Sequence, residues 1–439
     1  MRSKQGMWIF LVAAGAAIAV WSCRPAEKPA PPEHPAVRAG AEVLLERHLD
    51  LIRGKHIGLV TNQSALLADG RHLLDALLAQ PDVTVQALFS PEHGLLGAAP
   101  DGAEVAHGRD ARTDIRIYSL FGEVTKPTPE MLAGVDLLVY DIQDVGVRFY
   151  TFSSTLFLTL EAAAEQGIPY LVLDRPNPIT GGRVEGPLLE APQRSFVGLF
   201  PLPIAHGMTL GELAGLANEE GWLKDGVKAD LRVIKAEGWS RAQWFDETGL
   251  RWVKPSPNIM TLETAVVYPG ACLIEGTNVS EGRGTEKPFE TVGAPYIDGP
   301  ALAAAMNGWG LPGVTFEPVE FTPRDILKVT TDPKYENEAC RGIFIKVTDR
   351  NAFRPVAMGI HLLATLKKLY PEGFRWRSPS RSTGKSYIDL LAGTPRLREM
   401  VDAGETPQKT IAALNVGLEG FLAVRGKYLL YEGSPRPAR

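Results

Sequence analysis

The sequence has few cysteines and no concentrated block of basic residues. Among 439 residues there are three cysteines, and after Cys23 only Cys272 and Cys340 remain. In an exported protein such a pair is compatible with one disulfide or with two buried thiols. The formal net charge of -5, with lysine and arginine dispersed, gives none of the clustered positive charge that phosphate neutralisation requires. Nucleic acid is therefore excluded as a partner.

Several motifs that mark cofactor or nucleophile sites are also missing. No G-x-G-x-x-G follows the first strand-like run, which argues against a dinucleotide. The chain has no H-E-x-x-H for zinc and no G-x-S-x-G for a nucleophilic serine. The string RSTGKS ends like a phosphate-binding loop, but Pro379 stands where that loop needs its first glycine. These absences predict chemistry that rests on carboxylates and needs no cofactor or metal.

The composition is that of an ordinary globular protein, with 45% hydrophobic and 22% charged residues. A chain of this length has material for more than one core, so we expect two domains. Near Lys254 a long stretch dense in Pro, Gly, Asn and Thr begins, too broken for long helices, and long loops inside a folded chain are usually functional. We place the boundary near Thr264, which gives domains at 42–263 and 264–439.

The amino-terminal residues have the layout of a secretory signal. A basic start precedes an apolar stretch from Met7 to Trp21, and the stretch ends in VWSC. A cysteine at that point resembles a bacterial lipoprotein cleavage site, so we expect a signal peptide at 1–22 and lipidation of Cys23. The Pro/Ala-rich residues 23–41 are predicted to form an extended tether. The expected product is an exported, periplasmic lipoprotein whose membrane contact is this amino-terminal anchor.

The first half of the chain repeats one pattern, in which a short apolar run is followed by a polar turn and a segment with helical spacing. The strand-like runs are HIGLV, VTVQALF, VDLLVY and IPYLVL, and the predicted helices are LLADGRHLLDALLAQ and STLFLTLEAAAEQG. Alternating strands and helices imply an α/β fold with a mostly parallel sheet covered on both faces. Ligands bind such sheets at the carboxyl ends of the strands, where the strand order reverses.

Polar clusters follow all four strand-like runs, and we expect them to form one site. The clusters contain Asn62, then Glu92 and His93, then Asp141, Gln143, Asp144, Arg148 and Tyr150, and finally Asp174, Arg175 and Asn177. Each cluster also has a purely structural interpretation, as a proline-fixed turn or as an ion pair that closes a turn. A carboxyl group at the mouth of an apolar sheet loses part of its hydration, which suits Glu92 to act as a general acid.

The second half has weaker patterns. A capping box, Thr209 with Glu212, opens a predicted helix, and DLRVIKAEGW and RGIFIKVTD are predicted strands. Further helices are expected at about 355–370 and within PQKTIAALNVGLEGFLAVR.

A glycine-rich loop, EGTNVSEGRGTEKPFE, concentrates polar side chains that include Asn278, Glu281 and Arg283. Its spacing does not fit a calcium-binding loop. We expect it to reach over the crevice and contact the ligand.

The longest motifs together resemble one bacterial family. FSPEHGLLG, DIQDVGVRFYT, LDRPNP, HGMTLGELA, PSPN and YPGACLIEGTNVSEGRGTEKPFE occur in the order typical of the NamZ-type exo-β-N-acetylmuramidases, and the resemblance extends from about Val43 onward. It implies a Rossmann-like amino-terminal domain, a smaller mixed α/β carboxy-terminal domain, and an active site in the cleft between them. It also implies release of N-acetylmuramic acid from the non-reducing end of peptidoglycan-derived glycans. The family's proposed catalytic glutamate corresponds to Glu92.

Glycoside hydrolysis fits these residues independently, because it usually needs one carboxylic acid to protonate the leaving oxygen and a second group opposite it. With Glu92 as the acid, we expect Asp141, Asp144 or Glu281 to activate water, or the substrate's own acetamido oxygen to attack the anomeric carbon.

N-acetylmuramic acid carries a lactyl carboxylate, so a cationic clamp is expected as well, and Arg148, Arg175 and Arg283 are the candidates. Tyr150 is a candidate wall for a sugar ring, with a core aromatic as the alternative. The other residues expected to bind substrate are Asn62, His93, Gln143, Asp174, Asn177, Asn278 and Glu281.

A rival hypothesis is a lipid-anchored protein that captures muramyl glycans without cleaving them. Both hypotheses predict an arginine clamp, but only the enzyme needs Glu92 as a proton donor. An esterase or amidase is disfavoured because the chain lacks an activated serine or a metal motif.

Overall fold

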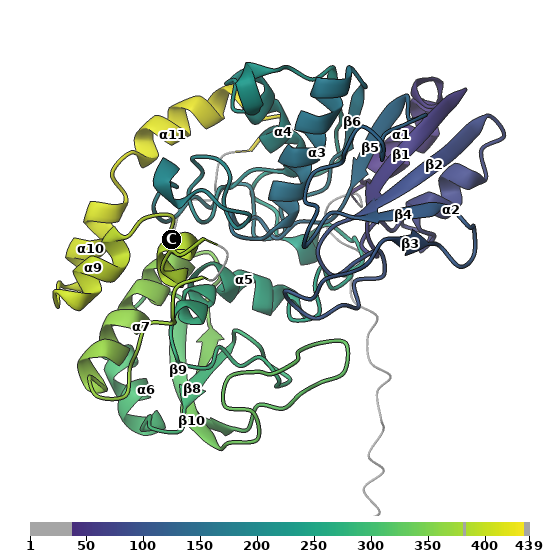
Figure 1. Ribbon diagram of the computed structural model, residues 1–439. Helices are drawn as coiled ribbons and strands as arrows, with labels where there is room; N and C mark the ends of the chain where they lie inside the picture. Colours follow the sequence, from purple (N-terminus) through teal and green to yellow (C-terminus); the bar gives the residue numbers. More distant parts are fainter. Residues whose placement is uncertain (1–36, 381–382, 434–439) are drawn as a thin grey trace, which may run out of the picture.

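The computed structural model describes residues 37–380 and 383–433, which form two α/β units that share a large hydrophobic core (Figure 1). The amino-terminal unit is built on a seven-stranded sheet and the carboxy-terminal unit on a three-stranded sheet. Cys23, the predicted signal peptide and most of the tether lie outside the described residues. Within 37–380 and 383–433, no helix combines the length and the apolar character needed to cross a membrane.

The larger sheet has the strand order β3-β4-β2-β1-β5-β6-β7, and every neighbouring pair is parallel except β3 with β4. Its strands are β1 Lys55–Thr61, β2 Val83–Ser90, β3 Gly108–Arg109, β4 Arg116–Ser119, β5 Leu137–Asp141, β6 Tyr170–Leu173 and β7 Leu231–Ile234. The chain moves outward in one direction from β1 to β2 and in the other from β5 to β7, so the order reverses between β1 and β5. The predicted α/β fold with a mostly parallel sheet is confirmed.

Side chains on the central strands alternate between two hydrophobic layers. Ile57 and Leu59 of β1 and Val139 of β5 pack against α1 and α2, whereas Val60 and Leu138 point to the opposite face, towards α3 and α4. The covering helices are α1 Gly40–Arg47, α2 Leu73–Leu78, α3 Phe152–Gln166 and α4 Leu210–Glu219. Burial on both faces explains why these strands are nearly continuous apolar runs.

Two of the local predictions have different outcomes. The capping box is confirmed, because Thr209 Oγ1 accepts a hydrogen bond from the Glu212 amide and the Glu212 carboxylate accepts one from the Thr209 amide. The helix predicted over LLADGRHLLDALLAQ is shorter than expected, since Gly70 adopts a left-handed φ of 85° in a turn that precedes α2.

The carboxy-terminal unit pairs an antiparallel sheet with helices. The sheet has the order β8-β10-β9 and consists of β8 Thr291–Ala294, β9 Val314–Phe321 and β10 Cys340–Val347. The α-helices are α5 Leu262–Ala271, α6 Gly299–Asn307, α7 Pro355–Leu369, α8 Tyr387–Ala392, α9 Arg396–Asp402, α10 Pro407–Leu414 and α11 Leu418–Arg425. Short 3₁₀ helices occur in both units. In the amino-terminal unit they are η1 Leu49–Leu51, η2 Ala191–Gln193, η3 Lys224–Gly226 and η4 Phe245–Glu247, and in the carboxy-terminal unit they are η5 Cys272–Gly276 and η6 Gly426–Tyr428.

Two further expectations for this unit are corrected. The Pro/Gly-rich stretch contains the ten-residue helix α5, which Thr261 caps and which accommodates Pro269 near its end. The single terminal helix is two, α10 and α11, because Gly417 at φ 96° breaks the path between them.

The end of the described chain returns to the first unit. Helix α11, yellow in Figure 1, runs back towards α4. Beyond it, Tyr428 donates a hydrogen bond to Glu220 at 2.7 Å and Tyr431 donates one to Asp174 at 2.6 Å. A segment that lies within 264–439 by sequence thus packs on the amino-terminal unit. Cys272 and Cys340 are both free and buried.

Candidate active site

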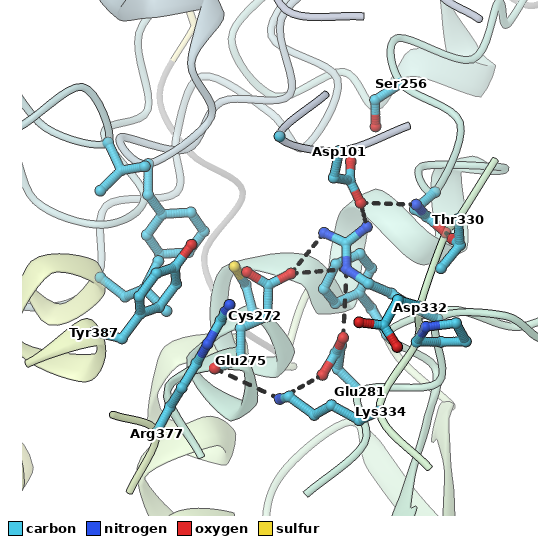
Figure 2. Close-up of a pocket in the computed structure, with 18 of the residues that line it drawn as sticks. Asp101, Ser256, Cys272, Glu275, Glu281, Thr330, Asp332, Lys334, Arg377 and Tyr387 are labelled. Atoms are coloured by element: carbon cyan, nitrogen blue, oxygen red, sulfur yellow. Dashed lines mark hydrogen bonds and ion pairs between the residues drawn. The ribbon is translucent and has the colours of Figure 1, made fainter. Parts of the chain in front are cut away.

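A cleft of about 1140 Å³ lies where the two units meet, and both contribute to its lining. The first unit supplies the turn after β2 and the loop that leads into α3. The second supplies η5 with the glycine-rich loop after it, the loop between β9 and β10, residues 376–378, and Tyr387 with Leu391 of α8. Figure 2 shows acidic and basic side chains from these segments pointing towards one another across the cleft.

Glu92 and His93 are presented by a tight turn directly after β2. His93 and Gly94 adopt left-handed φ angles of 70° and 75°, so the chain reverses as soon as the strand ends. Both carboxylate oxygens of Glu92 are held, one by the Thr151 hydroxyl at 2.7 Å and the other by the Gly102 amide at 3.1 Å. The turn therefore fixes a half-buried carboxyl group at the cleft wall.

The imidazole of His93 is buried beside this carboxyl group. Its Nδ1 lies 2.8 Å from the carbonyl oxygen of Ala99 and therefore carries the ring proton. Burial lowers the pKa of His93, which keeps the ring neutral. The other nitrogen, Nε2, lies 3.7 Å from a carboxylate oxygen of Asp101.

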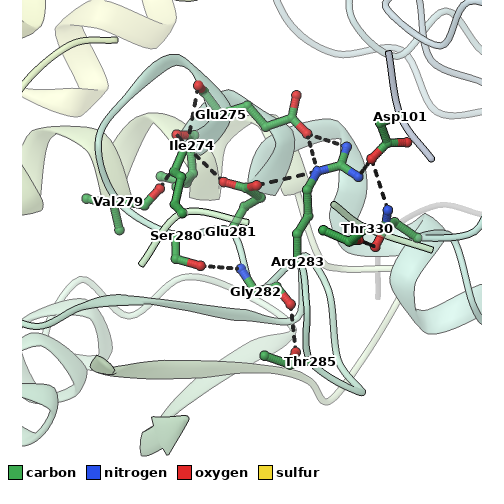
Figure 3. Close-up of polar contacts among 12 residues, drawn as sticks. Asp101, Ile274, Glu275, Val279, Ser280, Glu281, Gly282, Arg283, Thr285 and Thr330 are labelled. Atoms are coloured by element: carbon green, nitrogen blue, oxygen red, sulfur yellow. Dashed lines mark hydrogen bonds and ion pairs between the residues drawn. The ribbon is translucent and has the colours of Figure 1, made fainter. Parts of the chain in front are cut away.

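Arg283 lies at the centre of the charged cluster (Figure 3). Its Nε and Nη2 donate to one oxygen of Glu275 at 3.0 and 2.6 Å, its Nη1 pairs with Asp101, and Nε lies 3.4 Å from Glu281. The guanidinium also lies over the ring of Phe289, 5.0 Å from the centroid. Arg283 lines the cleft as predicted, but three protein carboxylates already surround it.

Lys334, from the loop between β9 and β10, fixes the base of the same cluster. Its Nζ donates to the carbonyl oxygens of Ile274 and Val279 at 3.3 and 2.9 Å and to Glu281 at 2.8 Å. Glu281 therefore lines the cleft with its charge compensated from both sides. Burial, and next the charge of Glu281, raises the pKa of Glu275.

Asn258 connects the two sides of the cleft. Its amide nitrogen donates to Asp101 at 2.9 Å and to the Val329 carbonyl at 3.2 Å, and its oxygen accepts from the Thr330 hydroxyl at 2.9 Å. Asp101 belongs to the first unit, and the other two belong to the loop between β9 and β10. Asn258 is 1% exposed, and it therefore fixes that loop relative to Asp101.

The predicted roles of Asp141 and Arg175 are corrected by their positions. Neither lines the cleft, and they form a buried pair in which Arg175 Nε and Nη2 donate to the two oxygens of Asp141 at 2.5 and 3.0 Å. A further bond runs from Arg175 to the Leu66 carbonyl. The ion pair fastens the loops after β1, β5 and β6 to each other, where strand order reverses.

Arg148 also differs from its predicted role as a clamp. Its guanidinium is buried and donates to the carbonyl oxygens of Pro187, Leu202 and Leu391 at 3.0, 2.8 and 2.7 Å. Leu391 belongs to α8, so Arg148 joins the two units behind the cleft. Burial lowers the pKa of Arg148 to about 9, and the side chain is still a cation at neutral pH.

Asp144 lies behind the cleft lining rather than in it. One carboxylate oxygen accepts from the Gly146 amide at 2.7 Å and lies 3.8 Å from His206, and the other has no hydrogen-bond partner among the described residues. Burial raises the pKa of Asp144 to about 7. Its predicted role as the group opposite Glu92 is not supported by this position.

The remaining polar residues of the strand ends form turns instead of lining the cleft. Asn62 accepts bonds from Ser64, Gln143 donates to main-chain carbonyls of Asp144 and Pro176, Asp174 accepts from Thr209, Gly211 and Tyr431, and Asn177 bonds the backbone of Met208 and Ile179. The predicted contact of these four side chains with substrate is therefore corrected to a structural role.

Two other predicted residues do line the cleft. Tyr150 packs edge-to-face against Phe152 and Tyr268, so its ring is fixed as part of the wall. Asn278 uses its amide for the Gly373 carbonyl and its oxygen for the Arg375 amide, and so shapes the lining.

Sequence reasoning missed Asp101, Thr151, Asn258, Lys334 and Arg377, which all line the cleft. They lie in loops, where no apolar periodicity marks them. Two of them, Asn258 and Thr151, end the motifs PSPN and DIQDVGVRFYT, but neither motif by itself indicates which of its residues lines a cleft. Arg377 stacks on the ring of Tyr387, with its guanidinium carbon 4.1 Å from the centroid. Within the described parts of the chain, no group of three or more His, Cys, Asp or Glu side chains could hold a metal ion.

Comparison with known proteins gives consistent matches over most of the chain. The amino- and carboxy-terminal domain models of the exo-β-N-acetylmuramidase NamZ match residues 57–263 and 266–431. The peptidoglycan β-N-acetylmuramidase NamZ of Bacillus subtilis (strain 168) is 44% identical over 410 residues, covering 93% of this chain and 95% of that protein.

Two crystal structures of DUF1343 family proteins from Bacteroides fragilis NCTC 9343 share the fold. One is 32% identical with a TM-score of 0.81 and covers 90% of this chain and 99% of its own. The other is 31% identical with a TM-score of 0.72 and covers 92% and 100%.

Proposed function

The chain belongs to the exo-β-N-acetylmuramidase NamZ family, and we propose that it is a glycoside hydrolase that releases N-acetylmuramic acid from the non-reducing end of peptidoglycan-derived glycans. The observation that carries the chemistry is the position of Glu92. This carboxyl group is held at the wall of a cleft between two units, and the cleft is wide enough for a sugar.

Glu92 is the proposed general acid. As the bond between the anomeric carbon and the leaving oxygen breaks, its carboxyl group gives a proton to that oxygen. The hydroxyl of Thr151 and the amide of Gly102 donate to the two oxygens of Glu92 and fix the orientation of its carboxyl group, so the group need not be oriented anew in each turnover. Water then completes hydrolysis and returns a proton to Glu92.

For the group opposite Glu92 we propose the substrate's own acetamido oxygen, which is one of the exceptions to the two-carboxylate scheme. Asp141 and Asp144 lie outside the cleft lining, and Glu281 is paired with Arg283 and Lys334. Attack by the acetamido oxygen on the anomeric carbon predicts retention of configuration. Inversion would instead require a carboxylate of the cleft to activate water on the opposite face of the sugar.

The experiment is hydrolysis of a chromogenic β-N-acetylmuramide by the purified full chain, with the anomer of the first product identified by NMR. A β-N-acetylglucosaminide is the substrate control, Glu92→Gln is the test variant, and Glu419→Gln on the exposed face of α11 is the matched control. We expect turnover of the muramide to fall by about 10³-fold or more in Glu92→Gln and to be unchanged in Glu419→Gln. Ligand binding without turnover by the wild-type chain would support the capture protein instead.

We further propose that the protein is exported and anchored through a lipid on Cys23. The support is the sequence alone, in which a basic start and an apolar stretch end at this cysteine. Cys23→Ser should move the protein from the membrane fraction to the soluble fraction while activity per molecule stays the same.

A further inference from the structure

Three cationic side chains of the second unit line the cleft, and two of them are already paired. Arg283 is surrounded by Asp101, Glu275 and Glu281, and Lys334 is held by Glu281 and main-chain carbonyls. Recruiting either for a substrate carboxylate would break existing ion pairs whose carboxylates are largely buried. Breaking a buried pair leaves an uncompensated charge, which is costly.

Arg377 is in a different situation. Among the residues that the structure describes, its side chain has no hydrogen bond and no ion pair, although it lines the cleft. Figure 2 shows it beside Tyr387, on the side of the cleft away from Thr330. Its guanidinium therefore has all of its donors available.

The position of Arg377 is fixed although its side chain is exposed. Its main-chain amide donates to the Gly276 carbonyl at 2.9 Å, and the preceding residue Trp376 forms a bridge with Thr277. The stack on Tyr387, whose α8 is anchored in the core, restricts the guanidinium plane. A planar cation held over an aromatic face keeps its edge free for a bidentate bond to a carboxylate.

N-acetylmuramic acid differs from N-acetylglucosamine by its lactyl ether, which carries a carboxylate. We propose that Arg377 receives this lactyl carboxylate and thereby makes the enzyme select muramic acid over N-acetylglucosamine. The inference rests on the proposed function, since it presupposes a muramyl substrate in this cleft. Arg377 thereby takes the clamp role that was predicted for Arg148 and Arg175. Those two side chains instead donate to protein carbonyls and to Asp141.

Nearby charges do not cancel the cation. Glu275 lies close enough for the positive charge of Arg377 to favour its ionised form, but burial dominates and raises the pKa of Glu275 to about 8. The Glu275 carboxylate is paired with Arg283 at 2.6 Å, so its charge is compensated by that guanidinium and the donors of Arg377 are left for an incoming carboxylate.

The test compares two versions of one substrate, a chromogenic β-N-acetylmuramide with a free lactyl carboxylate and its methyl ester. We expect Arg377→Gln to lower kcat/KM about 10- to 100-fold on the acid and no more than about twofold on the ester. Arg377→Lys, which keeps the charge but not the planar fork, should fall between. Arg375→Gln is the matched control, because Arg375 is exposed in the same segment and its side chain, among the residues that the structure describes, bonds only the carbonyls of Pro371 and Phe374.

The outcomes separate the two proposals. If the wild-type chain cleaves the muramide and Arg377→Gln keeps its preference for the acid over the ester, the role of Arg377 is wrong and the proposed function stands. An equal loss on acid and ester also overturns it, because that pattern indicates a structural role. If the wild-type chain cleaves neither, the proposed function fails first and this inference fails with it.

Discussion

The buried pair of Asp141 and Arg175 gives the sharpest test of which polar residues serve the fold and which serve the chemistry. Both were expected from sequence to act on substrate, yet their side chains are 0% and 7% exposed and bond each other. The perturbation is a cycle of Asp141→Asn, Arg175→Met and the double variant.

The magnitude follows from what each change leaves behind. Arg175→Met strands a buried carboxylate, which costs about 3–5 kcal/mol, and leaves the Leu66 carbonyl without its bond, which costs about 1 kcal/mol more. Asp141→Asn strands the cation but keeps an acceptor, so about 2–3 kcal/mol is expected. The double variant removes both charges and should lose about 3 kcal/mol less stability than the sum of the single losses, because the penalty for a stranded charge is counted in each single variant.

The assay is the urea midpoint of each variant, together with kcat measured well below the unfolding transition. Glu317→Gln, which breaks an exposed pair with Lys346, is the control and should have little effect. Since neither residue of the buried pair lines the cleft, folded variants should keep kcat within about threefold of wild type. A fall in kcat of about 10³-fold with an unchanged urea midpoint would refute the reasoning and return Asp141 to the chemistry.

Two further predictions concern the neighbours of the cleft. Burial raises the pKa of Asp144 from 3.8 to about 7, so the folded chain binds more protons between these values and loses stability as pH rises through them. Asp144→Asn should therefore raise the free energy of unfolding, obtained from urea titrations, above pH 7 by on the order of 4 kcal/mol at most relative to wild type. The gain should disappear towards pH 4, and a pH-independent difference would contradict this. Asn258→Asp places a second carboxylate against Asp101, and we expect kcat/KM to fall about tenfold or more. The control is Asn415→Asp on the exposed end of α10, which should leave kcat/KM unchanged. Equal values for the two variants would show that the hydrogen bonds of Asn258 do not determine the geometry of the cleft.

Sequence patterns predicted the larger sheet because its strands can be recognised from the hydrophobicity of neighbouring residues alone. Each central strand is apolar on both faces, as Leu138 and Val139 show, and each strand is followed by a turn and a helix. The pattern failed where a single residue decides the path. Gly417 divides the terminal helix through its left-handed φ, and the Pro/Gly-rich texture around α5 hid a helix that is stabilised by burial of nearly all its residues.

The candidate site was predicted only in part, and the reason is physical. A polar residue at the end of a strand satisfies either a ligand or the neighbouring backbone, and the sequence pattern is the same in both cases. Asn177 bonds the Met208 carbonyl, and Asp174 bonds Thr209 and Tyr431, so their partners lie 31 to 257 residues away along the chain. Glu92 is different because its turn projects beyond the sheet, towards the second unit.

The cleft needs both units because each supplies different side chains to it. The proposed acid, Glu92, lies in the part of the chain matched by the amino-terminal family model, and the cations Arg283, Lys334 and Arg377 lie in the part matched by the carboxy-terminal one. Chemistry at the anomeric carbon and recognition of the lactyl group are then set by the distance between units rather than within one. Asn258 and the pair of Arg283 with Asp101 span that junction, so substitutions there should alter the fit between the acid and its substrate while both units stay folded.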